Sequence, residues 1–233
     1  MTFYQIKMAV YATFLTNYYG LKLKRTSKAK EKKRLRTEYS KTLLNRLNIE
    51  VELKNPEKIP LKGQFLLISN HRSVIDPILI EAATEHHHIF GHWISKKELY
   101  NSFFFGLFVK NAGTVLLDRD AKQMGSFFAD IKRCVKAGDS IYLFPEGTRS
   151  KNGVELGKFQ GGAQLIAMKN RLSILPLYIS TQANDTLRAS LQDSRKKRKI
   201  IIEVGDIIDY KDRSRSLEEN YREQFHISSP IEK

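Results

Sequence analysis

Short β-branched or aromatic runs alternate with helical patterns from about residue 48 onward, and this alternation constrains the fold more than any other feature. The apolar runs are IEVEL (49–53), FLLIS (65–69), IFGHWI (89–94), TVLL (114–117), IYLF (141–144), ILPLYI (174–179) and IIIEV (200–204). Helical patterns lie between them at residues 76–85, 121–138 and 161–170. This order predicts an α/β domain with a mixed, mostly parallel sheet flanked by helices. The run SRKKRK at 194–199 then predicts a solvated loop that leads into an edge strand.

The first 47 residues differ from the rest and are predicted to form a separate helical segment. Residues 1–24 are apolar and rich in tyrosine, but their longest clean apolar window, MAVYATFL, has eight residues. That is far short of the ~20 needed to span a bilayer. A second helix is predicted for residues 30–47. We therefore expect an amphipathic, basic membrane-binding segment over residues 1–47 and an α/β domain over residues 48–233.

The charge of the chain is unevenly spread and indicates an anionic partner. Of the net charge of +15, a balance of +9 lies in the 26 residues from Leu21 to Arg46, where eleven Lys or Arg face two Glu. Such an imbalance is typical of proteins that bind nucleic acid, anionic lipid or an acidic carrier protein. The segment lacks a motif for reading nucleic acid, whereas its tyrosine rings suit the headgroup level of a bilayer. An anionic phospholipid membrane is therefore favoured. The alternatives are a basic nucleic-acid-binding module and a helix docked on the protein's own core.

Cysteine content and the N-terminal pattern indicate the compartment. The single Cys134 cannot form an intramolecular disulfide, so a reducing environment is expected. No short basic stretch leads into an unbroken apolar run, so the chain shows no secretory signal of the usual shape. Together with the basic segment, these features predict a protein held peripherally or monotopically on the cytoplasmic face of a membrane.

Three polar clusters follow predicted strands, at the positions where α/β sheets collect their functional groups. They are NHRSVIDP (70–77), DRD (118–120) and PEGTRS (145–150). In the first cluster, Asp76 and Pro77 also form a good helix start, with Asp76 as the N-cap and Pro77 at the first helical position. A carboxylate has enough acceptor sites to cap a helix and also to hold the imidazole of His71, provided that residues 72–75 turn back. An imidazole held in this way is oriented to act as a general base.

The chain offers this base no evident protein nucleophile. There is no G-x-S-x-G elbow, and Cys134 lies within a helical pattern, while Ser73 is the one weak candidate beside His71. A base without a nucleophile suits a substrate hydroxyl that attacks an already activated acyl group, such as a thioester. The histidines of EHHH (85–88) and His92 invite a metal site, but three consecutive histidines cannot share one face of a helix or strand. No metal is therefore expected.

Four blocks in order, between about residues 65 and 180, resemble the glycerolipid acyltransferase family, and most closely its 1-acylglycerol-3-phosphate (lysophosphatidate) branch. Asn70, His71 and Asp76 fit the family's His-x4-Asp block, and SKKELYNSFFFG (95–106) fits a Lys-x-Glu-Leu block whose lysine is Lys96. The second block, a glycine, a short apolar strand and an arginine, is met by Gly113, TVLLD (114–118) and Arg119. FPEGTRS (144–150) matches the third block in full, and Pro176 fits the fourth.

The resemblance implies that the chain transfers a fatty acyl group from acyl-CoA or an acyl carrier protein to the sn-2 hydroxyl of lysophosphatidate. The product would be phosphatidate, and no metal or bound cofactor would be needed. His71 and Asp76 are then the predicted catalytic residues. The predicted substrate-binding residues are Lys96, Arg119, Glu146, Gly147, Thr148 and Arg149.

Within that set, the two arginines suit a phosphate because a guanidinium presents a planar fork of donors. Gly147 lets the backbone approach closely. Glu146 is expected to hold an arginine or to bond the glycerol hydroxyl, since a carboxylate repels phosphate. The apolar run FFFGLFV (103–109) is either part of an acyl-chain tunnel, a lipid-dipping turn or a buried core helix. Glycerol 3-phosphate, another lysophospholipid and a lyso-aminolipid remain alternative acceptors.

Overall fold

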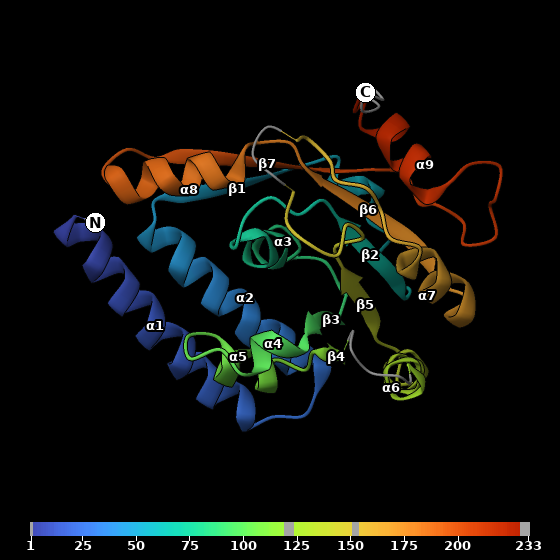
Figure 1. The fold of residues 1–233 in the computed structure, drawn as a ribbon, viewed down its shortest axis with the longest axis horizontal. Helices are drawn as coiled ribbons and strands as arrows, with labels where there is room; N and C mark the ends of the chain where they lie inside the picture. The colour runs from blue at the N-terminus through green and yellow to red at the C-terminus, as the bar shows by residue number, and fades with distance from the viewer. Residues whose placement is uncertain (1, 119–123, 151–153, 229–233) are drawn as a thin grey trace.

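The centre of the molecule is a seven-stranded sheet in the order β1-β7-β6-β2-β5-β3-β4 (Figure 1). The structure is a computed structural model that describes residues 2–118, 124–150 and 154–228. The strands are β1 (Ile49–Lys54), β2 (Phe65–Ser69), β3 (Gly91–Lys96), β4 (Val115–Leu117), β5 (Ser140–Leu143), β6 (Ser173–Ile179) and β7 (Arg198–Val204). Neighbouring strands pair in parallel except for β6 and β7, which are antiparallel. The predicted mixed, mostly parallel sheet is confirmed.

Each of the seven apolar runs forms a strand, but the prediction that SRKKRK leads into an edge strand is wrong. The strand that it enters, β7, lies between β1 and β6, and the edge on that side is β1. The reason is that residues 49–54 of β1 pair in parallel with residues 198–203 of β7. Beside this ladder, Glu50 and Glu52 form exposed ion pairs with Lys197 and Lys199 at 2.8 and 2.7 Å. The basic run is thus partly neutralised by the neighbouring strand, and β1 covers the backbone of β7.

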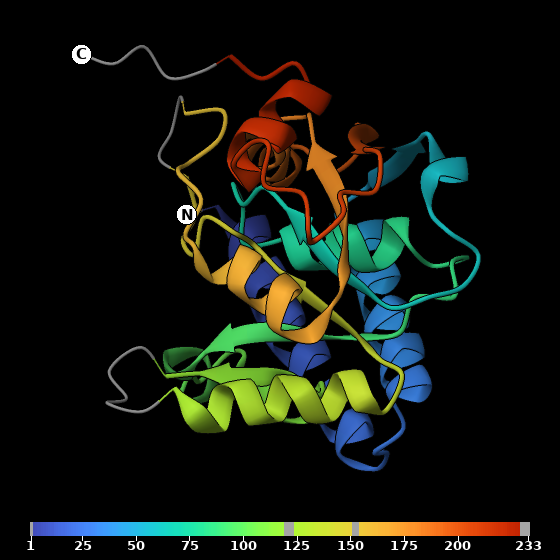
Figure 2. The ribbon, with the colours of Figure 1, turned by 90° about the vertical axis from the view of Figure 1, so that its right-hand side faces the viewer.

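Helices cover both faces of this sheet (Figures 1 and 2). One face carries α1 (Phe3–Lys24), α2 (Ala29–Arg46), α3 (Asp76–Ala83), α5 (Gly106–Asn111) and α8 (Ala183–Gln192), which share one apolar core. The other face carries α6 (Gly125–Lys136), α7 (Gly162–Asn170) and α9 (Leu217–Gln224), which share a second core. The short helices η1 (Pro56–Lys58) and α4 (Lys97–Tyr100) lie in connections. Figure 2 shows α6 and α7 in front of the sheet and α1 and α2 behind it.

Helix α1 is apolar on two opposite sides. Met8, Leu15, Tyr19 and Leu23 are buried in the core, so this side docks on the protein itself. The other side exposes a stripe of apolar residues at helical spacing, with the exposed fraction in parentheses: Phe3 (84%), Ile6 (49%), Val10 (66%), Phe14 (71%), Tyr18 (46%) and Leu21 (54%). We call these six residues the outer stripe. Among the residues that the structure describes, no helix combines the length and the apolar character needed to cross a membrane.

Helix α5 lies against α1 because a glycine allows close contact. A methyl group at Gly20 would lie 3.0 Å from both the Leu107 side chain and the Phe108 backbone. The turn before α5 exposes Phe103 (83%), Phe104 (52%) and Phe105 (37%). FFFGLFV is therefore not a buried core helix, since its first three rings are exposed and only residues 106–109 are buried or half-buried.

Candidate active site

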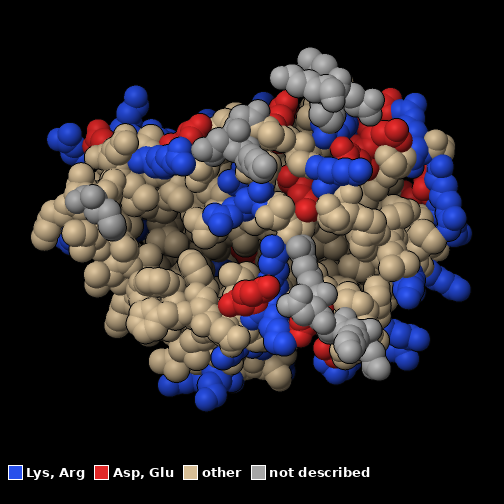
Figure 3. All heavy atoms as spheres, viewed as in Figure 1, with Lys and Arg blue, Asp and Glu red and all other residues tan. Residues whose placement is uncertain are grey.

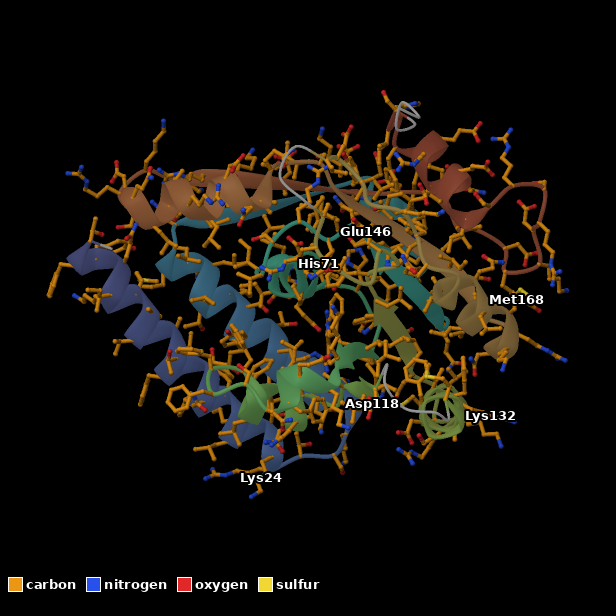
Figure 4. The ribbon with its side chains drawn as sticks, in the orientation of Figure 1. Lys24, His71, Asp118, Lys132, Glu146 and Met168 are labelled. Carbon is orange, nitrogen blue, oxygen red and sulfur yellow. The ribbon has the colours of Figure 1, made fainter. Side chains whose placement is uncertain are left out.

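His71 and the loop after β5 meet because their strands are parallel neighbours. Leu66, Leu67 and Ile68 of β2 pair with residues 141–143 of β5, so the carboxyl ends of both strands open at the same edge of the sheet. His71 follows β2 within two residues, and the segment 144–150 follows β5 directly. Figure 4 shows His71 and Glu146 close together in the middle of the molecule, with Lys24, Lys132 and Met168 at its outside.

The imidazole of His71 is hydrogen-bonded to Asp76. The distance from His71 Nδ1 to Asp76 Oδ2 is 2.8 Å, and the Asp76 side chain is fully buried. The same carboxylate oxygen accepts the backbone N–H groups of Arg72 (2.6 Å) and Ser73 (2.7 Å). One carboxylate oxygen therefore holds both the imidazole and the turn at residues 72–73 that places the imidazole next to Asp76. Within the described ranges, no side chain or backbone group forms a hydrogen bond with His71 Nε2.

The prediction that Asp76 is an N-cap is wrong by one position. Helix α3 begins at Asp76 itself, with Ile75 as the N-cap and without a side-chain cap bond. The carboxylate is turned back toward the backbone of the preceding turn instead of toward the first turn of the helix. Ser73 is fully buried, and its hydroxyl has no partner among the described groups.

The face of the His71 ring rests on Phe144. Their ring centroids are 4.1 Å apart with an interplanar angle of 10°, a stacked arrangement. Phe144 in turn stacks on Trp93, at 5.1 Å and 28°. The imidazole is thus held at its edge by Asp76 and on its face by an aromatic pair.

The residue before the histidine, Asn70, ties this loop to the sheet. Its amide nitrogen donates to the carbonyl of Ile179 (3.1 Å), and its amide oxygen accepts the N–H of Ile179 (2.8 Å). Its own backbone N–H donates to the hydroxyl of Tyr221 on α9 (3.2 Å). Since Asn70 is fully buried, these bonds fix the backbone from which His71 projects.

Glu146 clamps two loops together and, among the described residues, forms no ion pair with an arginine. Its carboxylate accepts the backbone N–H of His71 (2.6 Å), the hydroxyl of Ser150 (3.0 Å) and the N–H of Gly157 (2.7 Å). Burial raises the pKa of Glu146, while these three donors oppose the rise. A Cβ at Gly157 would lie 2.5 Å from the Glu146 carboxylate, so position 157 needs a glycine. Glu146 positions the loop that carries the base.

A cavity of about 1390 Å³ opens at this point, with His71 on its wall. Most of its lining is apolar and comes from α1, α2, α3 and α5 on one face of the sheet and from α6 and α7 on the other. Lys96, Gly147, Thr148 and Arg149 also line it. Figure 3 shows a recessed middle on this face of the molecule with Lys and Arg side chains beside it.

The other predicted substrate-binding residues fall into three groups. Thr148 and Arg149 are exposed at the rim after the turn at Gly147, whose φ is 68°. Lys96 is half-buried in the cavity wall at the end of β3, whereas its neighbour Lys97 bonds Asp118 at 2.6 Å. Arg119 lies outside the described residues.

Two residues that support this site, Arg72 and Trp93, are not predicted from the sequence. Arg72 is buried and donates twice to the carbonyl of Glu155 (2.9 and 2.6 Å) and once to the hydroxyl of Tyr178 (3.1 Å). Trp93 lies behind Phe144. Arg72 follows the histidine directly, so its place in the block is a signal, but its partners are more than 80 residues away along the chain. For Trp93 the sequence carries no signal of this kind.

His92, considered above as a metal ligand, belongs to a hydrogen-bonded pair outside the cavity lining. Its ring nitrogens lie 2.5 Å from the Gly113 carbonyl and 3.0 Å from Asp139 Oδ2. Burial lowers the pKa of His92, but Cys134, Asp139 and the Gly113 carbonyl outweigh burial and raise it to about 9. In the part of the chain that the structure describes, His, Cys, Asp and Glu form no group of three or more that could hold a metal ion.

Comparisons with known proteins agree with this geometry. A family model described as Acyltransferase matches residues 50–180. The 1-acyl-sn-glycerol-3-phosphate acyltransferase of Helicobacter pylori is 36% identical over 118 residues, which are 50% of this chain and 48% of the relative. The enzyme of that name from Streptococcus pneumoniae is 29% identical over 136 residues, 58% of this chain and 49% of the relative. The chain thus spans about half the length of the curated relatives it matches.

One solved structure shares the fold over nearly the whole chain. The 1-acyl-sn-glycerophosphate acyltransferase of Thermotoga maritima superposes with a TM-score of 0.66 at 23% sequence identity. The match covers 96% of this chain and 90% of that one, so it includes the N-terminal helices as well as the sheet.

Proposed function

Since the chain belongs to the acyltransferase family, with residues 50–180 as the matching part, we propose that it acylates the sn-2 hydroxyl of 1-acylglycerol 3-phosphate. The observation that carries this proposal is the His71–Asp76 pair on the wall of a large apolar cavity whose rim holds a cation, Arg149. The apolar lining suits acyl chains, and the cation suits a phosphate monoester. The relatives named above carry this activity in their names, which adds support.

The geometry supports a direct transfer without an acyl-enzyme. His71 Nε2 takes the proton of the sn-2 hydroxyl while Asp76, at Nδ1, stabilises the imidazolium that forms. The hydroxyl oxygen bonds to the thioester carbonyl carbon, and the carbon–sulfur bond breaks. The departing sulfur takes the proton back from His71, so phosphatidate and a free thiol leave and the imidazole is again neutral. Acyl-CoA and an acyl carrier protein both supply such a thioester.

The test of the proposed function is a thiol-release assay with an acceptor panel. Purified protein receives an acyl-CoA or an acyl carrier protein thioester together with lysophosphatidate, glycerol 3-phosphate, a lysophosphatidylcholine or a phosphate-free monoacylglycerol. We expect lysophosphatidate to give the largest kcat/KM. A larger value for glycerol 3-phosphate or for the phosphate-free lipid contradicts the proposed acceptor and leaves the reaction class standing.

Arg149→Ala is expected to raise the KM for lysophosphatidate by about 10-fold or more, because a hydrogen bond to a charged group contributes roughly 1.5–3 kcal/mol. Within the described ranges the guanidinium has no acidic partner, so the whole effect should come from the substrate. Initial rates against lysophosphatidate concentration measure it, with monoacylglycerol as the phosphate-free comparison. Arg188→Ala on α8, which removes an exposed arginine paired with Asp185, is the matched control. An unchanged KM in Arg149→Ala excludes phosphate binding by this residue.

We also propose that residues 1–47 bind the surface of an anionic membrane and that residues 48–233 carry the chemistry. The outer stripe of α1 and Phe103 and Phe104, in the turn before α5, are exposed apolar residues on two segments that pack together at Gly20. Lys24, Arg25 and Lys28 are exposed at the end of α1 and in the loop that follows. Exposed rings beside cations suit the boundary between acyl chains and anionic headgroups. The cavity is lined by Gln5, Met8 and Ala9 of α1, so a lipid acceptor would have a short path to His71.

Phe14→Asp combined with Phe103→Asp is expected to weaken binding to vesicles of phosphatidylglycerol and phosphatidylcholine by 100-fold or more. The reason is that full burial of each phenylalanine contributes roughly 1.5–3 kcal/mol. Co-sedimentation across a lipid titration measures the change. Leu61→Asp, which alters an equally exposed apolar residue (86%) in the connection before β2, is the matched control. Equal loss in the control, or none in the double variant, excludes this surface.

A further inference from the structure

A buried charge cluster between α2 and α3 has no place in the mechanism described so far. Arg36 Nε and Lys33 Nζ of α2 lie 2.7 and 2.8 Å from the two carboxylate oxygens of Glu81 on α3. The side chains of all three residues are 5% exposed or less. Arg36 also donates to the carbonyls of Ala112 (2.8 Å) and Gly91 (2.8 Å), and Lys33 to the hydroxyl of Thr84 (2.7 Å). The cluster therefore joins α2, α3, β3 and the end of α5.

Stability is a weak reason for such a cluster. Taking charges out of water is costly, and well-packed apolar residues often replace a buried ion pair at no loss of stability. Arg36 and Lys33 share a single carboxylate, and burial lowers the pKa of Lys33 although Glu81 opposes that effect. Burial raises the pKa of Glu81, but Arg36 and Lys33 outweigh it and lower the pKa to about 2, so the carboxylate stays ionised. A buried, ionised carboxylate with an ion pair at each oxygen has one defined position.

Two aromatic rings, those of Trp93 and Phe144, connect the Glu81 carboxylate to the imidazole of His71. Glu81 Oε1 accepts the indole N–H of Trp93 at 2.8 Å. Trp93 stacks on Phe144, and Phe144 stacks on the imidazole of His71, with centroids 5.1 and 4.1 Å apart. Tyr142 packs edge-on against Trp93 at 5.4 Å, and its hydroxyl donates to the carbonyl of Ile89 (2.8 Å). Trp93 is thus held by a hydrogen bond at its nitrogen and by ring contacts with Phe144 and Tyr142.

We propose that Glu81 and Trp93 are positioning residues for His71, and that they fix the plane of its imidazole through Phe144. The inference rests on the proposed role of His71 as the base. Asp76 holds one edge of the ring at Nδ1, but a single hydrogen bond leaves the ring able to tilt about it. The stack on Phe144 removes this freedom, provided that Phe144 is itself held from behind. Only Trp93, which the Glu81 carboxylate holds in turn, stacks there among the described residues.

The first test is Trp93→Phe, which keeps an aromatic face for Phe144 but deletes the N–H that Glu81 accepts. We expect kcat to fall on the order of 10-fold, since small misplacements of a catalytic group cost up to about 100-fold. Trp93 lines the cavity, and phenylalanine keeps an apolar ring there, so the KM values for lysophosphatidate and for the thioester should stay within twofold. A kcat within twofold of the wild type overturns the proposal.

A matched pair of variants isolates the hydrogen bond from the charge. Lys33→Met with Glu81→Gln and Lys33→Met with Glu81→Leu both leave Arg36 as the only charge in the cluster. They differ in whether residue 81 can accept the Trp93 N–H. We expect the glutamine variant to keep kcat within twofold of the wild type and the leucine variant to lose on the order of 10-fold, again without a change in KM. Equal kcat in the two overturns the proposal.

A spectroscopic readout that needs no turnover accompanies the rates. Trp93 is the only tryptophan in the chain, so time-resolved fluorescence anisotropy reports on this ring alone. We expect faster local depolarisation in the leucine variant than in the glutamine variant. Anisotropy decays that coincide while both variants are folded contradict the positioning of Trp93 by Glu81.

The control removes an exposed ion pair between the same two segments of chain. Lys41 Nζ and Glu85 Oε1 lie 2.7 Å apart, and Lys41 is half exposed. Lys41→Met with Glu85→Gln should change neither kcat nor the anisotropy, and an equal loss of kcat in it shows a general effect of loosening α2. The wild type and His71→Ala, assayed in parallel, test the proposed function separately. Turnover that survives in His71→Ala excludes His71 as the base. A fully active Trp93→Phe excludes only the positioning role of Trp93.

Discussion

Replacing His71 with alanine is expected to lower kcat for acyl transfer by roughly 10²–10⁴-fold, the range that general-base catalysis typically contributes. The variant keeps Asp76 and the cavity, so it should still bind both substrates and associate with vesicles. The loss should therefore fall on kcat, with KM values close to those of the wild type. Thiol release at saturating lysophosphatidate and acyl thioester measures it.

His88→Ala is the matched control for that variant, because His88 is an exposed histidine remote from the cavity lining. Far-ultraviolet circular dichroism and thermal unfolding should show that both variants are folded. Turnover in His71→Ala within a factor of ten of the wild type would remove His71 as the base and leave the fold and the cavity without an assigned chemistry.

Asp76→Asn is expected to lower kcat by about 10²–10⁴-fold, approaching the loss in the histidine variant. The asparagine oxygen can still accept the N–H groups of Arg72 and Ser73, which holds the turn in place. It carries no charge, however, so it stabilises the imidazolium poorly. An asparagine that presents its nitrogen to Nδ1 also favours the wrong tautomer of the ring. The pre-steady-state rate of thiol release isolates this chemical step from product release.

The chain contains its own control for the second variant. His92 and Asp139 form another histidine–aspartate pair, with Nε2 and Oδ2 3.0 Å apart, and neither residue lines the cavity. Asp139→Asn should leave kcat unchanged. If the two aspartate variants lose activity to the same extent, the effect reflects the fold and not an oriented base at position 71.

Much of the architecture could be predicted because local pattern and tertiary environment agree. Each of the seven strands is a β-branched or aromatic run, and β2 is buried along its whole length. The order of strands in the sheet could not be predicted in the same way. Whether β1 or β7 forms the edge depends on strand pairing between residues about 149 apart, such as Ile49 with Arg198, and no local pattern in the sequence encodes a pairing over that distance.

The same distinction between local pattern and contacts distant in the sequence holds for the site. His71 and Asp76 are five residues apart, so a single turn brings them together and the sequence suffices to suggest it. The role of Glu146 depends on donors at positions 71 and 157, which only the packed loops bring together. The stack combines Trp93 within β3 with Phe144 and His71, which follow β5 and β2. Ring stacking leaves no spacing rule in a sequence, so Trp93 could not be identified in advance.

The pair of hydrogen bonds between Asn70 and Ile179 has a consequence for motion. An amide side chain that both donates to and accepts from one residue reproduces a rung of the sheet, so β2 and β6 stay joined for one step beyond the end of β2. His71 therefore directly follows a residue that is hydrogen-bonded to the sheet, and no unbonded residue separates the two. Loops ordinarily open at low free energy, whereas core strands open only with global unfolding. The backbone of His71 should thus share the slow hydrogen exchange of the central strands, even though it lies in a segment without regular secondary structure.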